Sequence, residues 1–260
     1  MSTADLHELA SQLRHAEITR VPIASPFARH IDVDEAYKVQ LINIEKKLNE
    51  GAVITGKKIG LTSKAMQNLL GVNEPDYGHL LDTMEVENGG TISIQSLVQP
   101  RVEGETAFFL KKDLTGPNVS VMDVLQATEA IVPALEIVDS RIEDWKITLE
   151  ETVADNASSG LYVLGEIPKK ITDIDSLTHI GMAMYRNGEL VNTGVGAAAL
   201  GNPAICVAWL ANKLSTYGIS LKAGEVVLSG ALAAMVEARP GDHFYAKFSE
   251  MGEVHVSFSK

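Results

Sequence analysis

Three carboxylates on two apolar segments constrain this chain more than any other feature of its sequence. Glu136 lies within residues 131–138, where every other position is apolar. Glu103 and Glu105 lie within residues 100–110, whose pattern predicts a strand that runs into the core. Residues two apart on a strand project to the same face, so these two carboxylates point together.

A buried carboxylate without a partner is costly enough that it normally takes up a proton or binds a cation. Three carboxylates that converge on one spot would need a bound cation, and an all-oxygen ligand set favours Mg²⁺ or Mn²⁺ over zinc. Two alternatives stay open at this point. Glu103 and Glu105 could line the solvated face of an antiparallel strand, and Glu136 could pair with Arg101 or Arg141.

Length, charge and cysteine content exclude several classes of protein. A chain of 260 residues fits one large domain, or one domain with a helical appendage. No apolar run approaches the ~20 residues of a membrane span, and the N-terminus lacks the pattern of a signal peptide. The lone Cys206 excludes an internal disulfide, so we expect a cytoplasmic protein. A net charge of −12 argues against nucleic acid as a partner.

The order of the predicted elements indicates an α+β fold. Apolar periodicity predicts a helix over residues 4–20 and a second from Asp34, as N-cap, to Gly51, with a loop through Pro22, Pro26 and Phe27 between them. We therefore expect a helical N-terminal region over residues 1–51 and a β-rich catalytic domain over residues 52–260. The strands do not alternate regularly with helices, which argues against a doubly wound parallel sheet.

The remaining predicted elements follow from local capping, turn and periodicity signals. In chain order they are a strand at 53–61, a short helix capped by Ser63 and ending at 70–71, a helix from Ser120 to about Ala130, a hairpin at 182–191 with an Asn-Gly turn, a helix from Asn202-Pro203 to Gly218, and strands at 226–230, 244–248 and 254–258.

Three further segments carry polar residues that could serve a site. At least one of Lys57 and Lys58 must face inward if that strand alternates, which is costly without an anionic partner; the alternative is a pair of charges on an edge strand. Asp76 follows Pro75 in a segment typical of a turn, where it could bond its own backbone. Residues 152–160 are predicted to form a polar loop before an apolar strand, and their small polar side chains could bind a carboxylate or could cap one another.

These segments together resemble the 2-hydroxypenta-2,4-dienoate (2-oxopent-4-enoate) hydratases, within the fumarylacetoacetate hydrolase-like superfamily. The resemblance covers nearly the whole chain, and its most specific matches are residues 56–65, 75–78, 100–105, 138–142 and 153–158. It implies a fumarylacetoacetase-like mixed β-roll body preceded by a small helical region. It also implies addition of water to a small 2-oxo or 2-hydroxy-dienoic acid, in a homo-oligomer that could associate with a related enzyme of the pathway.

The resemblance also implies roles for individual residues. Glu103, Glu105 and Glu136 would hold Mg²⁺ or Mn²⁺, in agreement with the interpretation from burial. Lys58 and Asp76 would be the catalytic pair.

Contacts with the substrate, on the same resemblance, would come from Leu61, Asn156 and Ser158. The competing activity is that of 4-oxalocrotonate decarboxylase, which shares the metal ligands and the Asp-Asn-Ala-Ser segment. Lys57 and residues 67–72, 144–146 and 159–160 favour the hydratase. The hydratase interpretation predicts a mainly apolar pocket wall opposite the metal.

Overall fold

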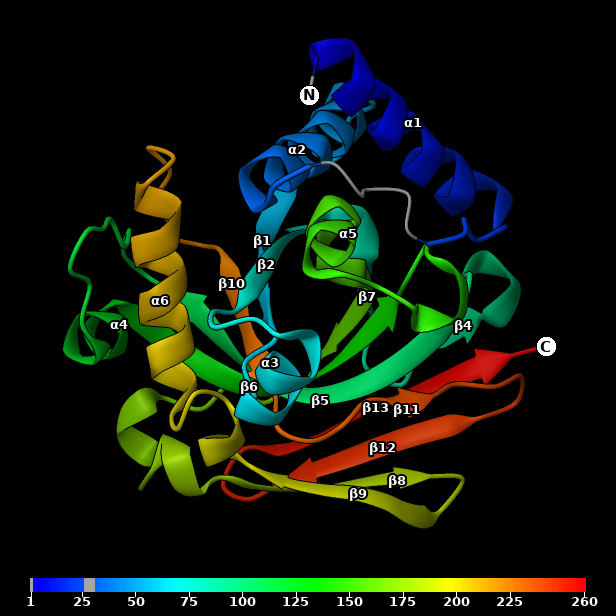
Figure 1. Cartoon of the computed structure of the whole chain (residues 1–260). Helices are drawn as coiled ribbons and strands as arrows, with labels where there is room; N and C mark the ends of the chain where they lie inside the picture. Colours follow the sequence, from blue (N-terminus) through cyan, green and yellow to red (C-terminus); the bar gives the residue numbers. More distant parts are fainter. Residues whose placement is uncertain (1, 26–30) are drawn as a thin grey trace.

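The computed structural model describes residues 2–25 and 31–260 (Figure 1). Its α-helices are α1 (Thr3–Thr19), α2 (Val33–Asn49), α3 (Lys64–Leu70), α4 (Val121–Ala127), α5 (Leu149–Ala154) and α6 (Pro203–Ser215). Its strands are β1 (Ile54–Gly60), β2 (Asp76–Leu81), β3 (Glu85–Val86), β4 (Thr91–Ser93), β5 (Pro100–Leu110), β6 (Thr128–Asp139), β7 (Ser159–Leu164), β8 (Gly181–Arg186), β9 (Glu189–Val195), β10 (Val226–Ala231), β11 (Val236–Glu237), β12 (His243–Phe248) and β13 (Gly252–Ser259).

Two sheets form the body of the molecule. The larger has the strand order β2-β1-β10-β5-β6-β7-β3, with β11 paired to β5. The smaller has the order β4-β13-β12-β8-β9 and lies along one side of the larger sheet (Figure 1). Strands of both sheets are mainly antiparallel, and the helices are not interleaved between parallel strands. The predicted α+β class is confirmed.

The larger sheet curls, so that β2 at one end of the strand order contacts β7 near the other end. Residues directly opposite each other on paired strands project from the same face. The register therefore assigns the residues of the inner face to two groups. We call one group the polar layer: Lys58, Gly60, Asp76, Gly78, Glu103, Glu105 and Glu136. We call the other the apolar layer: Leu80, Ala107, Val132, Ala134, Tyr162, Val226 and Leu228, which pack in one cluster.

Helices α1 and α2 pack against each other above the sheet (Figure 1). The predicted N-cap of α2 was wrong: Asp32 accepts a hydrogen bond from the backbone N of Glu35 at 2.8 Å, while Asp34 lies in the first turn. Of the predicted loop before α2, Pro26 and Phe27 lie outside the described residues. The buried side chains of α1 and of the first turns of α2 belong to the same core as the strands, and the division at residue 51 stays a prediction.

Most of the predicted elements are confirmed, and two need correction. The helix that begins after Ser120 ends at Ala127, because Thr128 already opens β6. The segment 152–160 is not a simple loop: it holds the end of α5, a single 3₁₀ turn at Asn156–Ser158 and the start of β7. No helix in the described part of the chain is long and apolar enough to cross a membrane.

Candidate active site

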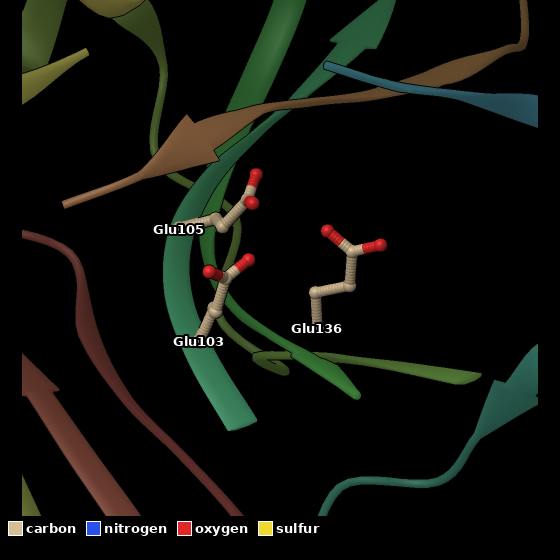
Figure 2. Close-up of side chains that lie close together, drawn as sticks. All are labelled: Glu103, Glu105 and Glu136. Atoms are coloured by element: carbon tan, nitrogen blue, oxygen red, sulfur yellow. The ribbon is translucent and has the colours of Figure 1, made fainter. Parts of the chain in front are cut away.

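The three glutamates converge, as the sequence predicts (Figure 2). Glu103 and Glu136 lie directly opposite each other on β5 and β6, and Glu105 lies two residues further along β5. One carboxylate oxygen from each lies within 4.8 Å of the others. Glu105 and Glu136 are each 1% exposed and Glu103 is partly buried, so the alternative of a solvated strand face is wrong.

The carboxylates destabilise one another in their charged forms. Burial, and then repulsion from Glu136, raises the pKa of Glu103 to about 7. The same two causes raise the pKa of Glu105 well above its ordinary value. Burial also raises the pKa of Glu136, against the opposing charge of Lys58. A cation between the three side chains would relieve both the repulsion and the loss of solvation.

The oxygens of Glu136 support that interpretation. Lys58 Nζ lies 3.1 Å from Oε1 of Glu136, and the two side chains form a buried ion pair. Among the residues that the structure describes, Oε2 of Glu136 is buried without a partner, and Oε1 has only this ion pair. An all-oxygen donor set with such oxygens fits a hard divalent cation. The alternative pairing of Glu136 with Arg101 or Arg141 is wrong, because Arg101 stacks on Trp145 and Arg141 binds Asp155.

Lys58 and Asp76 complete the polar layer. Burial would lower the pKa of Lys58, but the charges of Glu136 and then Asp76 raise it above its ordinary value, so the ammonium stays charged. Burial raises the pKa of Asp76 to about 6, and its Oδ1 has no hydrogen-bond partner within the described ranges. Gly60 lies opposite Asp76, and a Cβ there would lie 2.2 Å from Asp76 Oδ1, so only glycine leaves room for this carboxylate.

Both neighbouring lysines of β1 are buried, each 3% exposed, and they project from opposite faces of the sheet. Lys57 forms an ion pair of 3.1 Å with Glu225, away from the glutamates. The alternative of edge-strand charges is wrong, since β1 lies between β2 and β10. Asp76 likewise opens strand β2 instead of lying in a turn.

Residues 155–159, which we call the site turn, cover the polar layer beside β2. Asn156, Ala157 and Ser158 have φ values of 54°, 51° and 53°. This left-handed conformation costs an L-residue roughly 1–2 kcal/mol each, so the turn must be held by its surroundings. A Cβ on Gly78 would lie 2.3 Å from the carbonyl O of Asn156, which places the turn directly over that glycine and across from Lys58.

The predicted substrate contacts lie in different settings. The hydroxyl of Ser158 is buried and lies 3.3 Å from that of Thr152. The amide of Asn156 is engaged at both ends by the backbone of His79, accepting from N at 2.8 Å and donating to O at 2.9 Å. Leu61 follows β1 with φ of 55°, and its carbonyl accepts from Gln67 Nε2 at 2.8 Å.

Sequence reasoning missed the residues that hold the site turn. Arg141 Nε donates to Asp155 Oδ1 at 2.5 Å, Nη2 donates to Asp155 O at 2.6 Å and Nη1 donates to Ser159 O at 2.8 Å. Gln40 of α2 donates to Val153 O at 2.8 Å. One signal for Gln40 was present in the sequence. It lies four residues after Ala36 and four before Ile44, so the three side chains share one face of the helix, and that face proves to be buried.

Known proteins include relatives that are similar to this chain over most of its length. A family model described as fumarylacetoacetate (FAA) hydrolase C-terminal matches residues 74–258. The chain is 50% identical over 218 residues to a 2-hydroxypent-2,4-dienoate hydratase from Pseudomonas putida, covering 83% of this chain and 98% of the relative. It is 45% identical over 260 residues to a 2-keto-4-pentenoate hydratase from Paraburkholderia xenovorans (strain LB400), covering 99% and 96%.

Among solved structures, 4-oxalocrotonate decarboxylase from Pseudomonas putida G7, complexed with magnesium and adipate, superposes with a TM-score of 0.96 at 34% identity. The match covers 99% of this chain and 98% of that one. The curled sheet, the smaller sheet and the N-terminal helices are therefore shared with this structure, and the predicted fumarylacetoacetase-like fold is confirmed.

Proposed function

This chain belongs to the 2-keto-4-pentenoate hydratase family, within the fumarylacetoacetate hydrolase superfamily, and we propose that its polar layer converts 2-hydroxypenta-2,4-dienoate into 4-hydroxy-2-oxopentanoate. The enzyme is a hydro-lyase of the meta-cleavage degradation of aromatic compounds. The hydratase relatives are 50% and 45% identical, against 34% for the decarboxylase structure, which favours hydration over decarboxylation. The observation that carries the proposal is the convergence of three carboxylates, two of them fully buried, beside Lys58 and Asp76.

Glu103, Glu105 and Glu136 would hold Mg²⁺ or Mn²⁺. When bound, such an ion would supply Lewis-acid stabilisation of negative charge on the 2-oxygen and C1 carboxylate of the substrate. The buried Oε2 of Glu136, without a partner in the described part of the chain, and the raised pKa of Glu103 support this assignment.

The reaction requires two proton movements. In the first, the 2-hydroxyl loses its proton and C5 gains one, which gives an α,β-unsaturated ketone. In the second, the hydroxyl of water adds to C4 and C3 gains a proton. Each step develops negative charge on the 2-oxygen, and a preorganised cation stabilises such charge in a site that excludes water.

Lys58 and Asp76 have the properties that these steps need. The ammonium of Lys58 is buried and stays charged, so it can stabilise the 2-oxygen without being reoriented. With a pKa of about 6, Asp76 can hold a proton or release it near neutral pH, which suits proton transfer or orientation of the attacking water.

The site turn would bind the acidic end of the substrate. We propose that the hydroxyl of Ser158 donates to the C1 carboxylate or the enol oxygen, and that Leu61 borders the same end of the pocket. The side-chain amide of Asn156 already bonds His79, so its contribution to binding would be to fix the turn that carries Ser158.

The proposal is tested by incubating the purified, Mg²⁺-loaded protein with 2-hydroxypenta-2,4-dienoate and, separately, with 4-oxalocrotonate. We expect loss of dienol absorbance from the first and no rapid release of CO₂ from the second. Rapid CO₂ release without hydration of the dienoate would assign the decarboxylase activity instead.

We further propose a cytoplasmic homo-oligomer that could associate with a related enzyme of the pathway. The buried lone Cys206 supports a reducing compartment. Large exposed apolar side chains, such as Ile18 and Val21 at 62% exposure, support contacts between subunits. Sedimentation velocity tests the oligomer: a single species at the mass of one chain would contradict it.

A further inference from the structure

We propose that Gln40, on helix α2 and far from the glutamates in sequence, is a positioning residue that fixes the site turn relative to Lys58 and Asp76. This inference rests on the proposed function, because it assigns to Gln40 an effect on binding of the dienoate. Gln40 is 1% exposed, so its amide must find partners inside the protein.

The side-chain amide of Gln40 links strand β2 to helix α5, and α5 leads directly into the site turn. Its Nε2 donates to the carbonyl of Tyr77 on β2 at 3.1 Å and to the carbonyl of Val153 in α5 at 2.8 Å. Its Oε1 lies 3.0 Å from Nδ1 of His79, also on β2. Since Nε2 of Gln40 is the donor to both carbonyls, Oε1 is an acceptor and Nδ1 of His79 carries the proton.

The site turn cannot set its own position, because three successive residues in it have left-handed φ values. Two sets of contacts hold it. Arg141 ties Asp155 and Ser159 to the end of β6, through the carbonyl of Asp139, and thus to the strand of Glu136. Gln40 and Asn156 tie the turn to β2, the strand of Asp76 and the neighbour of Lys58.

The two sets of contacts therefore control different distances. The Arg141 contacts set the position of Ser158 relative to the metal ligands. The Gln40 contacts, together with those of Asn156, set its position relative to Lys58 and Asp76, because they link the turn and the end of α5 to β2. Loss of the Gln40 amide would leave the glutamates in place, while Ser158 would move away from Lys58 and Asp76.

The experiment compares Gln40→Met with Asn43→Leu in steady-state hydration of 2-hydroxypenta-2,4-dienoate, with Mg²⁺ affinity measured by calorimetry. Methionine keeps the length and volume of Gln40 and removes its hydrogen bonds. Asn43 is the matched control: it lies on the same helix, but its amide donates at 2.8 Å to Ala10 of α1 instead of to β2 or α5.

For Gln40→Met we expect KM to rise about tenfold with kcat changed less, the pattern of lost binding shared by substrate and transition state. Mg²⁺ affinity should stay at the wild-type value. Asn43→Leu should lower the melting temperature and leave KM unchanged. A Gln40→Met protein with lowered melting temperature and wild-type KM would overturn the inference, because it would show a purely structural role.

Should Gln40→Met fail to fold, Gln40→Asn provides the same test with a smaller disturbance. Asparagine keeps an amide but is one methylene too short to reach both carbonyls, so KM should again rise, and an unchanged KM would overturn the inference. A wild type that does not hydrate the dienoate would instead refute the proposed function, which keeps the two failures distinguishable.

Discussion

The polar layer and the apolar layer occupy the same inner face of one curled sheet, yet they have opposite energetics. The apolar layer is packed from side chains that are at most 4% exposed, drawn from β2, β5, β6, β7 and β10. The polar layer, on β1, β2, β5 and β6, holds Lys58 and four carboxylates whose pKa values are all raised. The apolar layer stabilises the fold, and the polar layer lowers that stability to create a site.

The two layers should therefore respond differently to substitution. Removing a side chain of the polar layer should cost activity and could relieve repulsion in the metal-free protein. Removing a side chain of the apolar layer should cost stability and leave the chemistry intact. The next three predictions test this division, in order of decreasing effect, and a fourth concerns the outer face of the same sheet.

Glu105→Gln should have the largest effect. It preserves volume, so the fold should persist, but it removes one of the three proposed metal ligands. We expect activity to fall by at least about a hundredfold and Mg²⁺ binding to weaken, as measured by calorimetry. The metal-free variant should melt no lower than metal-free wild type, because a repelling charge is gone. Full turnover by EDTA-treated wild type would break the prediction.

Lys58→Ala and Lys57→Ala separate the two faces of β1. Turnover should fall by roughly 10²–10³-fold in Lys58→Ala, which loses the ammonium that we propose stabilises the 2-oxygen of the substrate. Lys57→Ala should change turnover little but leave Glu225 without its cation, at a cost of about 3–5 kcal/mol in unfolding free energy. Equal losses of turnover in the two variants would show that the wrong face has been assigned to the site.

Leu80→Ala addresses the apolar layer on the strand that carries Asp76. Leu80 is 0% exposed, and its truncation should lower the free energy of unfolding by about 2–5 kcal/mol. Urea denaturation measures this loss, while kcat at a temperature where the variant is folded should match wild type. Leu190→Ala is the control: this side chain is 56% exposed, so its loss should change stability by no more than about 0.5 kcal/mol.

The smallest expected effect concerns His79, on the outer face of β2. It is a change in how the stability of the fold depends on pH. Burial, with the charge of Lys57, lowers its pKa to about 3, against 6.5 for an exposed histidine. The unfolded chain therefore binds a proton that the folded chain does not. The stabilising contribution is complete above pH 6.5 and is lost as pH falls toward 3, at about 1.4 kcal/mol per pH unit. His79→Gln should show a correspondingly weaker loss of stability in urea titrations between pH 6.5 and 5; parallel curves would contradict it.

Local patterns predicted much of the polar layer. The two-residue spacing of Glu103 and Glu105 and the apolar surroundings of Glu136 were sufficient to predict one buried carboxylate cluster. The pairing of Glu103 with Glu136 was not visible, because strand register depends on packing between distant segments. The choice of Lys58 over Lys57 came from the family resemblance, since alternation alone could not say which face was inner.

The contacts that hold the site turn were not predictable. Asn156 bonds the backbone of His79, 77 residues away in sequence, and no side-chain pattern records a bond to a backbone group. The prediction of the α2 N-cap failed for a local reason. Asp32 and Asp34 both precede the apolar stripe of the helix, and only the capping box with Glu35 distinguishes them.

We propose that the glutamates of the polar layer form a cluster whose mutual repulsion a bound divalent cation relieves. Thermal unfolding of EDTA-treated protein, with and without added Mg²⁺, tests it most directly and needs no substrate. We expect Mg²⁺ to stabilise wild type by about 2.7 kcal/mol at a hundredfold excess over its dissociation constant. Glu105→Gln should lose most of this stabilisation. A melting temperature of wild type that does not respond to Mg²⁺ or Mn²⁺ would contradict the account.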